Sequence, residues 1–505
     1  MRNQLAAVTV LMLLCAGLGT SALLSRAFAQ SHQLSAAQQE RLIGPKPAPS
    51  WYWRWVQWRL GEGYAKGHAL KAHLRPSHAP RQVPQWAWHK LHYFLLARQD
   101  RSPAGFHTKR HKSHTPTSTP PTTTTTGSPP SSPPPPTGSG AVTPPAAPGP
   151  YSVPAGAVSV STSAQLTSAL AAGTPTIVLA DGTYGGSTYF DDAGSSDIYA
   201  ANPQGAVLTA GLVVGGNHSS GGAVIRGLAF DVTNSGATFQ NSEVNIWGAA
   251  GEGTQVLDST FDGNWKVGVG LLALNPDGLV AQRLQFSDFT DSGIRATNNQ
   301  LASYGASVPT IKSITDISVD GVSRSTPGAS NGTSEAGLWI GQPVADGVHR
   351  ILIRNVSWSG IETCNNSWNT DFSDLDIDMS GSHAYAGVAV YLEHFSIGDT
   401  FESFSITGSK VGFNAEWNDG TPGNEAARND TIANGTIDAS GWNGGGHTAG
   451  IFLDEGTGST TISGVTFENQ NWAGIGAYKN SGTNSISGNT YQLDPGAVSV
   501  STGHL

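Results

Sequence analysis

A short pattern of apolar and polar positions returns many times in the second half of this chain. In each copy a glycine is followed by apolar residues at every second place, which predicts a β-strand with one buried face. The copies begin at Gly293, Gly337, Gly360, Gly387, Gly412, Gly450 and Gly474. They return roughly every 23 to 44 residues, which is the period of a solenoid rather than of a sandwich.

A second series of short apolar segments interleaves with the first. Its members end at Phe230, Phe261, Phe286, Val319, Trp358, Ile377, Ile406, Ile437, Phe467 and Tyr491. The two series predict about ten coils, each with at least two short strands joined by Asn-, Gly-, Asp- and Ser-rich turns. The coils leave almost no room for crossover helices, so a doubly wound α/β fold is disfavoured. We therefore predict an all-β fold, a parallel β-helix whose strands pair from coil to coil.

The region before the coils predicts a cap for this solenoid. Residues 162–173 are typical of a short helix, with Thr162 as the N-cap, Leu166 and Leu170 on one face and Gly173 at the end. Residues 176–184 then predict a strand, a turn and a second strand. A solenoid needs its first coil covered, because an open end exposes core and strand edges. We expect the helix to provide this cover.

The capping helix followed by the series of coils resembles the secreted right-handed parallel β-helix proteins of the pectate-lyase-like superfamily, over about residues 151–505. The resemblance implies a right-handed β-helix and activity on polysaccharides, because the family is rich in polysaccharide lyases and hydrolases. The family also has members with no known activity. No lyase motif of the family matches this chain residue by residue, so the resemblance assigns no site residue.

Residues 1–29 have the pattern of a secretory signal peptide. Arg2 precedes an apolar run over residues 5–24, and Ala27 and Ala29 frame an A-x-A cleavage site. The alternative is an uncleaved anchor, because about 20 apolar residues can just span a bilayer. Cleavage predicts a secreted, extracellular protein. It would leave Cys364 as the single cysteine, so the mature chain could form no internal disulfide.

Charge divides the rest of the chain into a basic segment and an acidic domain. Residues 44–112 carry 13 Lys and Arg against 2 acids, whereas residues 151–505 carry 11 against 33. Across residues 30–112, Trp and basic residues interleave, which favours attachment to cell-wall polymer or to an anionic membrane surface. The alternative is a small helical pair whose Trp residues pack together, and nucleic acid is disfavoured because the segment is secreted. Residues 113–150 are Pro-, Thr- and Ser-rich, which predicts a disordered, semi-rigid linker.

Strand parity predicts which side chains of the coils face outward. If Val388, Val390 and Leu392 face the core, then Tyr391 and Glu393 face solvent. The same rule places on this face Arg295, Trp339, Glu362, Asn414, Glu416, Phe452, Asp454 and Tyr478. Neighbouring coils lie about 4.8 Å apart, so these side chains should form columns along the solenoid.

The alignment of the columns depends on the register between coils. Counting from each glycine places Tyr391, Glu416, Asp454 and Tyr478 in one column, with Glu393 one pleat along. A slip of two residues preserves parity and would bring Glu393 into the column directly. Both alignments gather three carboxylates and several aromatic rings in one patch.

Glu393, Glu416 and Asp454 are the candidate catalytic residues of this patch. Acids this close cannot all carry charge cheaply, so one should hold a proton and could serve as a general acid. Carboxylates on adjacent coils suit a retaining glycosidase, with a separation of about 5 Å, and a wider spacing suits an inverting one. The alternative is that these acids have no catalytic role and only keep the outer face solvated.

The other outward residues are candidate sugar-binding groups. Flat rings come from Trp339, Tyr391, Phe452 and Tyr478, and polar groups from Arg295, Glu362 and Asn414. A lyase would need a base and a cation, and an acid-rich face repels uronates, so a hydrolase is favoured over a lyase. Calcium is a candidate ion, although no loop pattern fixes a site, and no other cofactor is predicted. The competing class is a non-catalytic carbohydrate-binding or adhesive solenoid, and we expect a monomer.

Overall fold

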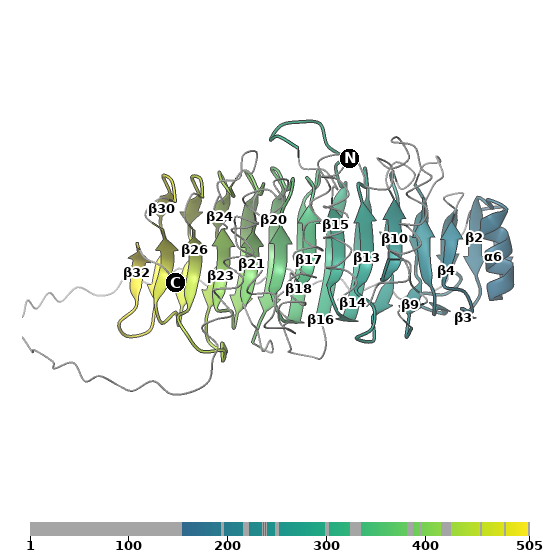
Figure 1. The fold of residues 1–505 in the computed structure, drawn as a ribbon, viewed down its shortest axis with the longest axis horizontal. Helices are drawn as coiled ribbons and strands as arrows, with labels where there is room; N and C mark the ends of the chain where they lie inside the picture. The colour runs from purple at the N-terminus through teal and green to yellow at the C-terminus, as the bar shows by residue number, and fades with distance from the viewer. Residues whose placement is uncertain are drawn as a thin grey trace, which may run out of the picture. The chain divides into compact units, whose positions relative to one another are not determined.

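A computed structural model describes residues 154–502, except 193–195, 216–221, 235, 237, 239, 248–251, 298–301, 324–334, 381–386, 394, 416–425, 455–456 and 479–480. The expected signal peptide, basic segment and linker lie outside the described residues, as does Glu416. The described part is the predicted parallel β-helix: its strands stack side by side along one axis (Figure 1), and every pair among them is parallel. No helix in this part is long and apolar enough to cross a membrane.

Two sheets form the walls of the solenoid. The 20-stranded sheet, here sheet A, contains two successive strand positions of each coil, and five of its strands run through both positions without a break. Its strands are β1 Val158–Val160, β2 Thr176–Leu179, β3 Gly182–Tyr184, β5 Asp197–Ala200, β6 Ala206–Leu208, β8 Val224–Arg226, β9 Ala229–Asp231, β11 Gln255–Leu257, β12 Thr260–Asp262, β14 Val280–Phe289, β16 Ser313–Val322, β18 Val348–Val356, β20 Asp371–Asp378, β22 Thr400–Thr407, β24 Thr431–Ala433, β25 Thr436–Asp438, β27 Thr461–Ser463, β28 Thr466–Glu468, β30 Ser485–Ser487 and β31 Thr490–Gln492.

The 12-stranded sheet, here sheet B, contains the glycine-led pattern of the sequence. Its strands are β4 Tyr189–Asp192, β7 Gly211–Val214, β10 Ser242–Trp247, β13 Val269–Leu274, β15 Ser292–Thr297, β17 Ala336–Gly341, β19 Ser359–Thr363, β21 Val388–Leu392, β23 Val411–Ala415, β26 Ala449–Leu453, β29 Ala473–Ala477 and β32 Val498–Ser501. The strands pair in chain order, so each coil adds one strand to the growing sheet.

The capping helix forms where the sequence predicts it. Helix α6 spans Ser163–Ala171, and the Thr162 side chain accepts a hydrogen bond from the Gln165 backbone N–H at 3.2 Å. Leu166 and Leu170 are buried in the core. The helix lies at the end of the row of coils (Figure 1). It therefore shields core residues that an uncovered first coil would expose.

The core is built from identical positions in successive coils. Phe230, Phe261 and Phe286 occupy one strand register and stack, with ring centroids 4.8 Å and 4.6 Å apart. Stacking at this distance follows from the spacing between coils. On the opposite wall, glycines leave room for such side chains: a Cβ at Gly450 would lie 2.2 Å from Phe467 Cδ1.

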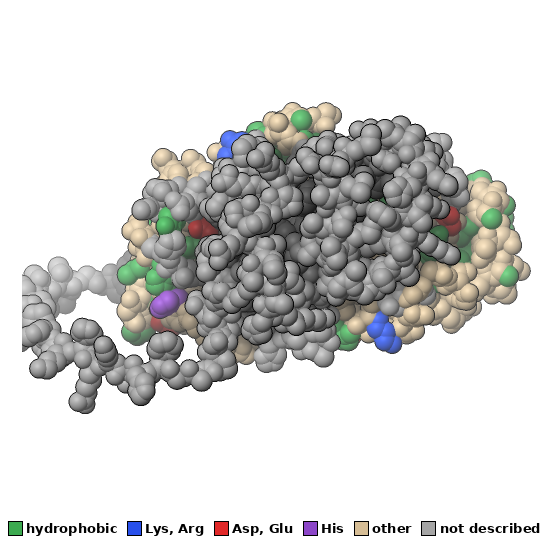
Figure 2. Space-filling view, in the orientation of Figure 1, with side chains coloured by type: hydrophobic (Ala, Val, Ile, Leu, Met, Phe, Trp, Pro, Cys, Tyr) green, Lys and Arg blue, Asp and Glu red, His purple; other side chains and the backbone are tan. Residues whose placement is uncertain are grey.

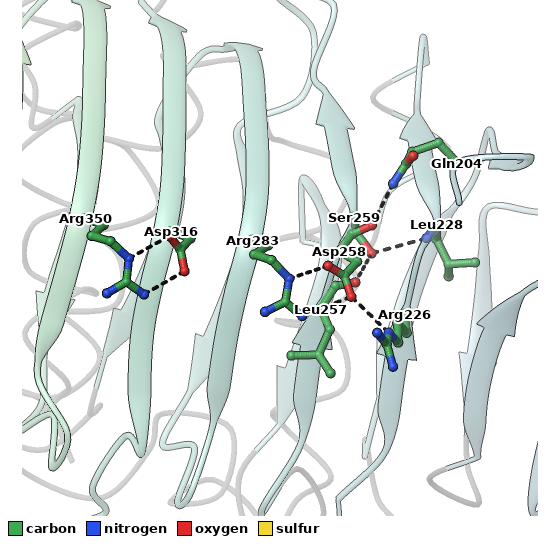
Figure 3. A network of polar contacts seen from close by, with 9 residues as sticks. All are labelled: Gln204, Arg226, Leu228, Leu257, Asp258, Ser259, Arg283, Asp316 and Arg350. Atoms are coloured by element: carbon green, nitrogen blue, oxygen red, sulfur yellow. Dashed lines mark hydrogen bonds and ion pairs between the residues drawn. The ribbon is translucent and has the colours of Figure 1, made fainter. Parts of the chain in front are cut away.

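Charged residues hold the corner between the two strand positions of sheet A. Asp258 is fully buried and accepts hydrogen bonds from Arg226 Nε at 2.9 Å and Arg283 Nε at 2.5 Å (Figure 3). Further along, Arg350 makes two 2.7 Å bonds to Asp316. Acidic and basic residues alternate along this corner. Four of them, Asp258, Arg283, Asp316 and Arg350, have φ between 51° and 57°. The ladder is structural, because Asp258 pairs with arginines of both neighbouring coils and Asp316 pairs with Arg350 of the next coil.

Charged side chains of the described part are not confined to this ladder, since Asp262, Asp288 and Asp320 lie close together on neighbouring coils of sheet A. Where the space-filling view shows described residues, uncharged polar side chains and backbone dominate, with isolated charged groups between them (Figure 2). Charged residues are 12% of the whole chain.

Candidate functional site

The outward residues of sheet B form one continuous column, as strand parity predicts. The pairing of β15, β17, β19, β21, β23 and β26 aligns Arg295, Trp339, Glu362, Tyr391, Asn414 and Phe452. Each residue is one coil from the next, so a neighbour lies about 4.8 Å away. The structure thus brings together, on one face, most of the groups that the sequence nominates.

The register of the second column corrects the count from glycines. Val388 pairs with Val411 and Val390 with Phe413, so Ala389 rather than Gly387 lies opposite Gly412. Gly387 precedes the strand with a φ of 58°, a conformation that suits a turn. The copy that begins at Gly387 is therefore shifted by two residues against the others.

This shift brings Glu393 into the column of acids. Leu392 and Leu453 lie in one register, and the residues that follow them are Glu393 and Asp454. Tyr478 follows in the next coil, where its N–H donates to Leu453 O at 2.8 Å. Tyr391 belongs to the neighbouring column, and the place between Glu393 and Asp454 corresponds to Glu416, outside the described part of the chain.

Trp339 and Glu362 are linked directly at the upstream end of the face. The Trp339 indole N–H donates to Glu362 Oε1 at 2.5 Å, and the Arg295 guanidinium lies 3.9 Å from the Trp339 ring centroid. Arg295 also pairs with Asp291 at 3.0 Å. Glu362 is fully buried and Trp339 is 5% exposed, so the ring positions the carboxylate and does not present an open face. The expectation of an exposed Trp339 is wrong.

Glu362, Cys364 and Glu393 converge next to this pair. One ligand atom from each lies within 4.8 Å of the other two, and all three residues are buried. These residues could hold a metal ion. A cysteine sulfur suits zinc better than calcium, which prefers oxygen ligands, so the donor set does not favour the calcium site considered from the sequence.

The aromatic residues further along pack against each other. Phe452, 7% exposed, forms a small apolar cluster with Val388 and Val411, and Tyr391 and Trp472 lie against it. Val388 therefore faces outward, and the prediction from strand parity that it faces the core is wrong. Phe452 offers no open ring because these neighbours cover it, whereas Tyr391 and Tyr478 are half-buried.

Sequence reasoning did not bring Cys364 into the site. Cys364 is a small packed residue, fully buried against Ala336 and Trp339, and its sulfur also lies close to carboxylate oxygens of Glu362 and Glu393. Cys364 follows Glu362 by two positions, so parity alone places both side chains on the same face. Its N–H donates to Ile340 O and Glu393 N–H to Thr363 O, which continues the ladder of sheet B to these residues. The signal was present in the spacing, but the approach of Glu393 depends on register.

Comparisons with known proteins found no relative in sequence and several distantly similar structures. No protein-family model and no curated protein matches this chain in sequence. In structure it is similar to an alginate lyase from a Paenibacillus species, with 15% identity, a TM-score of 0.36, and 69% of this chain and 98% of that chain covered.

Two further solved structures are similar to the same extent. The catalytic unit of an α-1,3-glucanase from Streptomyces thermodiastaticus has 15% identity and a TM-score of 0.43, and covers 69% of this chain and 71% of its own. A surface adhesin of Streptococcus pneumoniae has 10% identity and a TM-score of 0.40, with coverages of 68% and 89%. These values are too low to assign an activity. The function must be argued from the site.

Proposed function

We propose that this chain is a secreted, polysaccharide-active β-helix, and that its activity is glycoside hydrolysis by carboxylates on the outer face of sheet B. One observation carries the proposal: Glu362 and Glu393, on adjacent coils, have carboxylate oxygens within 4.8 Å of each other. Retaining glycosidases use two carboxyl groups about 5 to 5.5 Å apart. The extended face of the solenoid suits a linear polymer.

The surroundings assign different roles to the two acids. The Trp339 N–H stabilises negative charge on Glu362, which suits Glu362 to act as the nucleophile that attacks the anomeric carbon. Because the Glu362 side chain is fully buried, this role requires Trp339 to move aside when the polymer binds. Glu393 donates a proton to the leaving glycosidic oxygen. It then takes a proton from water, and that water displaces Glu362 from the sugar. Atoms balance with the addition of one water molecule per bond cleaved.

A second pairing would give the other stereochemical outcome. Glu393 and Asp454 lie in one column, two coils apart, which corresponds to about 9.6 Å between equivalent positions. This spacing is near the wide end of the range for inverting enzymes, about 6.5 to 9.5 Å. Glu393 is shared by both pairings, so the partner acid distinguishes them.

Three amide variants and one matched control test the proposal. Glu393→Gln should abolish the release of hydrolysis products from the polysaccharide that the wild type cleaves. Mass spectrometry identifies these products as fragments that have gained one water molecule. Glu362→Gln should do the same if the product retains its anomeric configuration, and Asp454→Asn if the configuration is inverted. Glu402→Gln, the same change at an exposed position on β22, should retain full activity. Unchanged turnover in Glu393→Gln would refute the assignment.

A polysaccharide lyase is the second candidate, because Glu362, Cys364 and Glu393 could hold a cation that neutralises a uronate. Lyase products are unsaturated, and their formation would stop after chelation and return with the added ion. The same assay identifies a third outcome. Retained polymer binding with no fragments would favour an adhesive solenoid over either enzyme.

A further inference from the structure

Two stacked turns begin at the candidate site. In the first, Ser367 N–H donates to Cys364 O at 3.2 Å, and in the next coil Ser396 N–H donates to Glu393 O at 3.1 Å. Each turn therefore starts with a residue of the buried group and ends three residues later with a serine. The position of the two site residues depends on how these turns are held.

One carboxylate oxygen binds both turn ends. Asp399 Oδ2 accepts hydrogen bonds from Ser367 Oγ at 2.8 Å and from Ser396 Oγ at 2.9 Å, and Oδ1 accepts one from Thr370 N–H at 2.9 Å. Ser396 Oγ also lies 2.9 Å from Thr363 Oγ1. All five residues are fully buried. The cluster therefore has defined partners and no access to bulk water.

The charged groups around Asp399 are few. Asp399 N–H donates to Asp430 Oδ1 at 2.9 Å, Asp371 acts on Asp399 through space, and Arg428 acts on Asp430. Burial raises the pKa of Asp399 to about 6, against the effect of its three hydrogen bonds. Burial and the neighbouring Asp399 also raise the pKa of Asp430 well above its usual range. Asp399 is thus ionised above about pH 6, where both serines can donate to it.

We propose that Asp399 is a positioning residue that clamps the turns of Cys364 and Glu393 and so fixes the spacing of the Glu362–Glu393 pair. The geometric part of this inference stands on the hydrogen bonds alone, and its catalytic consequence rests on the proposed function. When Asp399 is protonated, its Oδ2 must donate one bond and can no longer accept from both serines. The clamp is complete only in the ionised form, so activity should fall as the pH drops through about 6.

Asp399→Asn is the test variant, made in a full-length chain that also carries Cys15→Ser. Its Oδ1 can still accept from Thr370 N–H, but its amide nitrogen cannot accept from Ser367 and Ser396. Two readouts follow: polysaccharide turnover, and the rate at which a maleimide labels Cys364. Asp371→Asn, at an exposed neighbouring carboxylate, is the matched control.

At pH 8 the Asp399→Asn variant should label at Cys364 about tenfold faster, because hydrogen bonds to a charged group shift a local equilibrium by at least that factor. Its kcat should fall with little change in KM, and the acidic limb near pH 6 should disappear from its activity profile. Asp371→Asn should match the wild type in labelling and in kcat at pH 8, and its acidic limb should remain but lie at lower pH, because the charge of Asp371 raises the pKa of Asp399. A role in stability alone would lower thermal stability and activity together and leave the pH profile unchanged.

Labelling and kcat equal to those of the wild type would overturn the inference. If no polysaccharide is cleaved by the wild type, the proposed function fails, but the labelling rate still decides whether Asp399 holds the turns. If Asp399→Asn does not fold, Ser367→Ala and Ser396→Ala each remove one bond. The first should accelerate labelling of Cys364 and the second should lower kcat, and no effect from either would refute the clamp.

Discussion

Raising the pH from about 4 to about 8 should destabilise this β-helix, because buried carboxyl groups lose protons that the fold prefers to keep. A carboxyl group whose pKa is raised by folding contributes stability below its unfolded pKa, and this contribution is lost as the pH rises through the folded pKa. Asp399 has a pKa of about 6 instead of 3.8, and burial raises the pKa values of Glu243 and Asp430 well above their usual range.

The magnitude can be worked out for Asp399. A rise from 3.8 to about 6 corresponds to about 3 kcal/mol of unfolding free energy, lost between pH 3.8 and about pH 6. Small domains have total stabilities of roughly 5 to 15 kcal/mol, so this loss is large enough to measure. Hydrogen bonds lower the pKa values of Asp378 and Asp438, which has the opposite sign, but these two groups lose their contribution only below pH 3.8. Stability should therefore be greatest near pH 4.

Urea unfolding at constant ionic strength, at about pH 4, 6 and 8, measures this dependence. Asp399→Asn isolates one group, because its side chain resembles the protonated carboxyl. The variant should match the wild type near pH 4. At pH 8 it should be more stable than the wild type, by about 3 kcal/mol minus the contribution of the two lost serine hydrogen bonds. A wild-type midpoint that is constant or rises between pH 4 and 8, or a variant that is equally destabilised at every pH, would refute this reasoning.

Four further predictions concern packing, charge and attachment. Phe261→Ala removes the middle ring of a three-ring stack and should lower the urea-derived stability by about 3 to 5 kcal/mol. Gly450→Ala places a Cβ 2.2 Å from a core ring and should cost at least about 1 to 3 kcal/mol in the same assay. Asp258→Ala leaves two arginines without their shared carboxylate and should cost about 1 to 3 kcal/mol, an effect that high salt does not reproduce in the wild type. The full chain should sediment with anionic vesicles at low salt, and a variant that lacks residues 30–112 should not. Retained sedimentation of the deletion variant would refute the attachment hypothesis.

The fold could be predicted because its cause is local and repeated. Alternating apolar positions specify a strand, and their return at solenoid intervals specifies stacking, so parity alone placed Arg295, Trp339 and Glu362 on one face. The cap was equally local, since Thr162 and the two buried leucines belong to one helix. None of these features depends on how two distant segments align.

The register between coils could not be predicted, because a two-residue slip keeps every side chain on the same face. The pattern treated Gly387 and Gly412 as equivalent, whereas the structure puts Ala389 opposite Gly412. Packing decides the register. Glycine is required only where a core side chain occupies the space of a Cβ, as Ile437 does at Gly412. The sequence also shows no sign that Trp339 is covered.

The sequence by itself determined a parallel stack of coils, its cap and the face that bears the ionisable side chains, because these follow from periodicity and from contacts within single elements. Only the tertiary structure decided that Glu362, Cys364 and Glu393 converge and that Asp399 lies behind them. Those residues come from three coils, and their approach depends on register and on the turns between strands. Such contacts have no periodic trace in the chain.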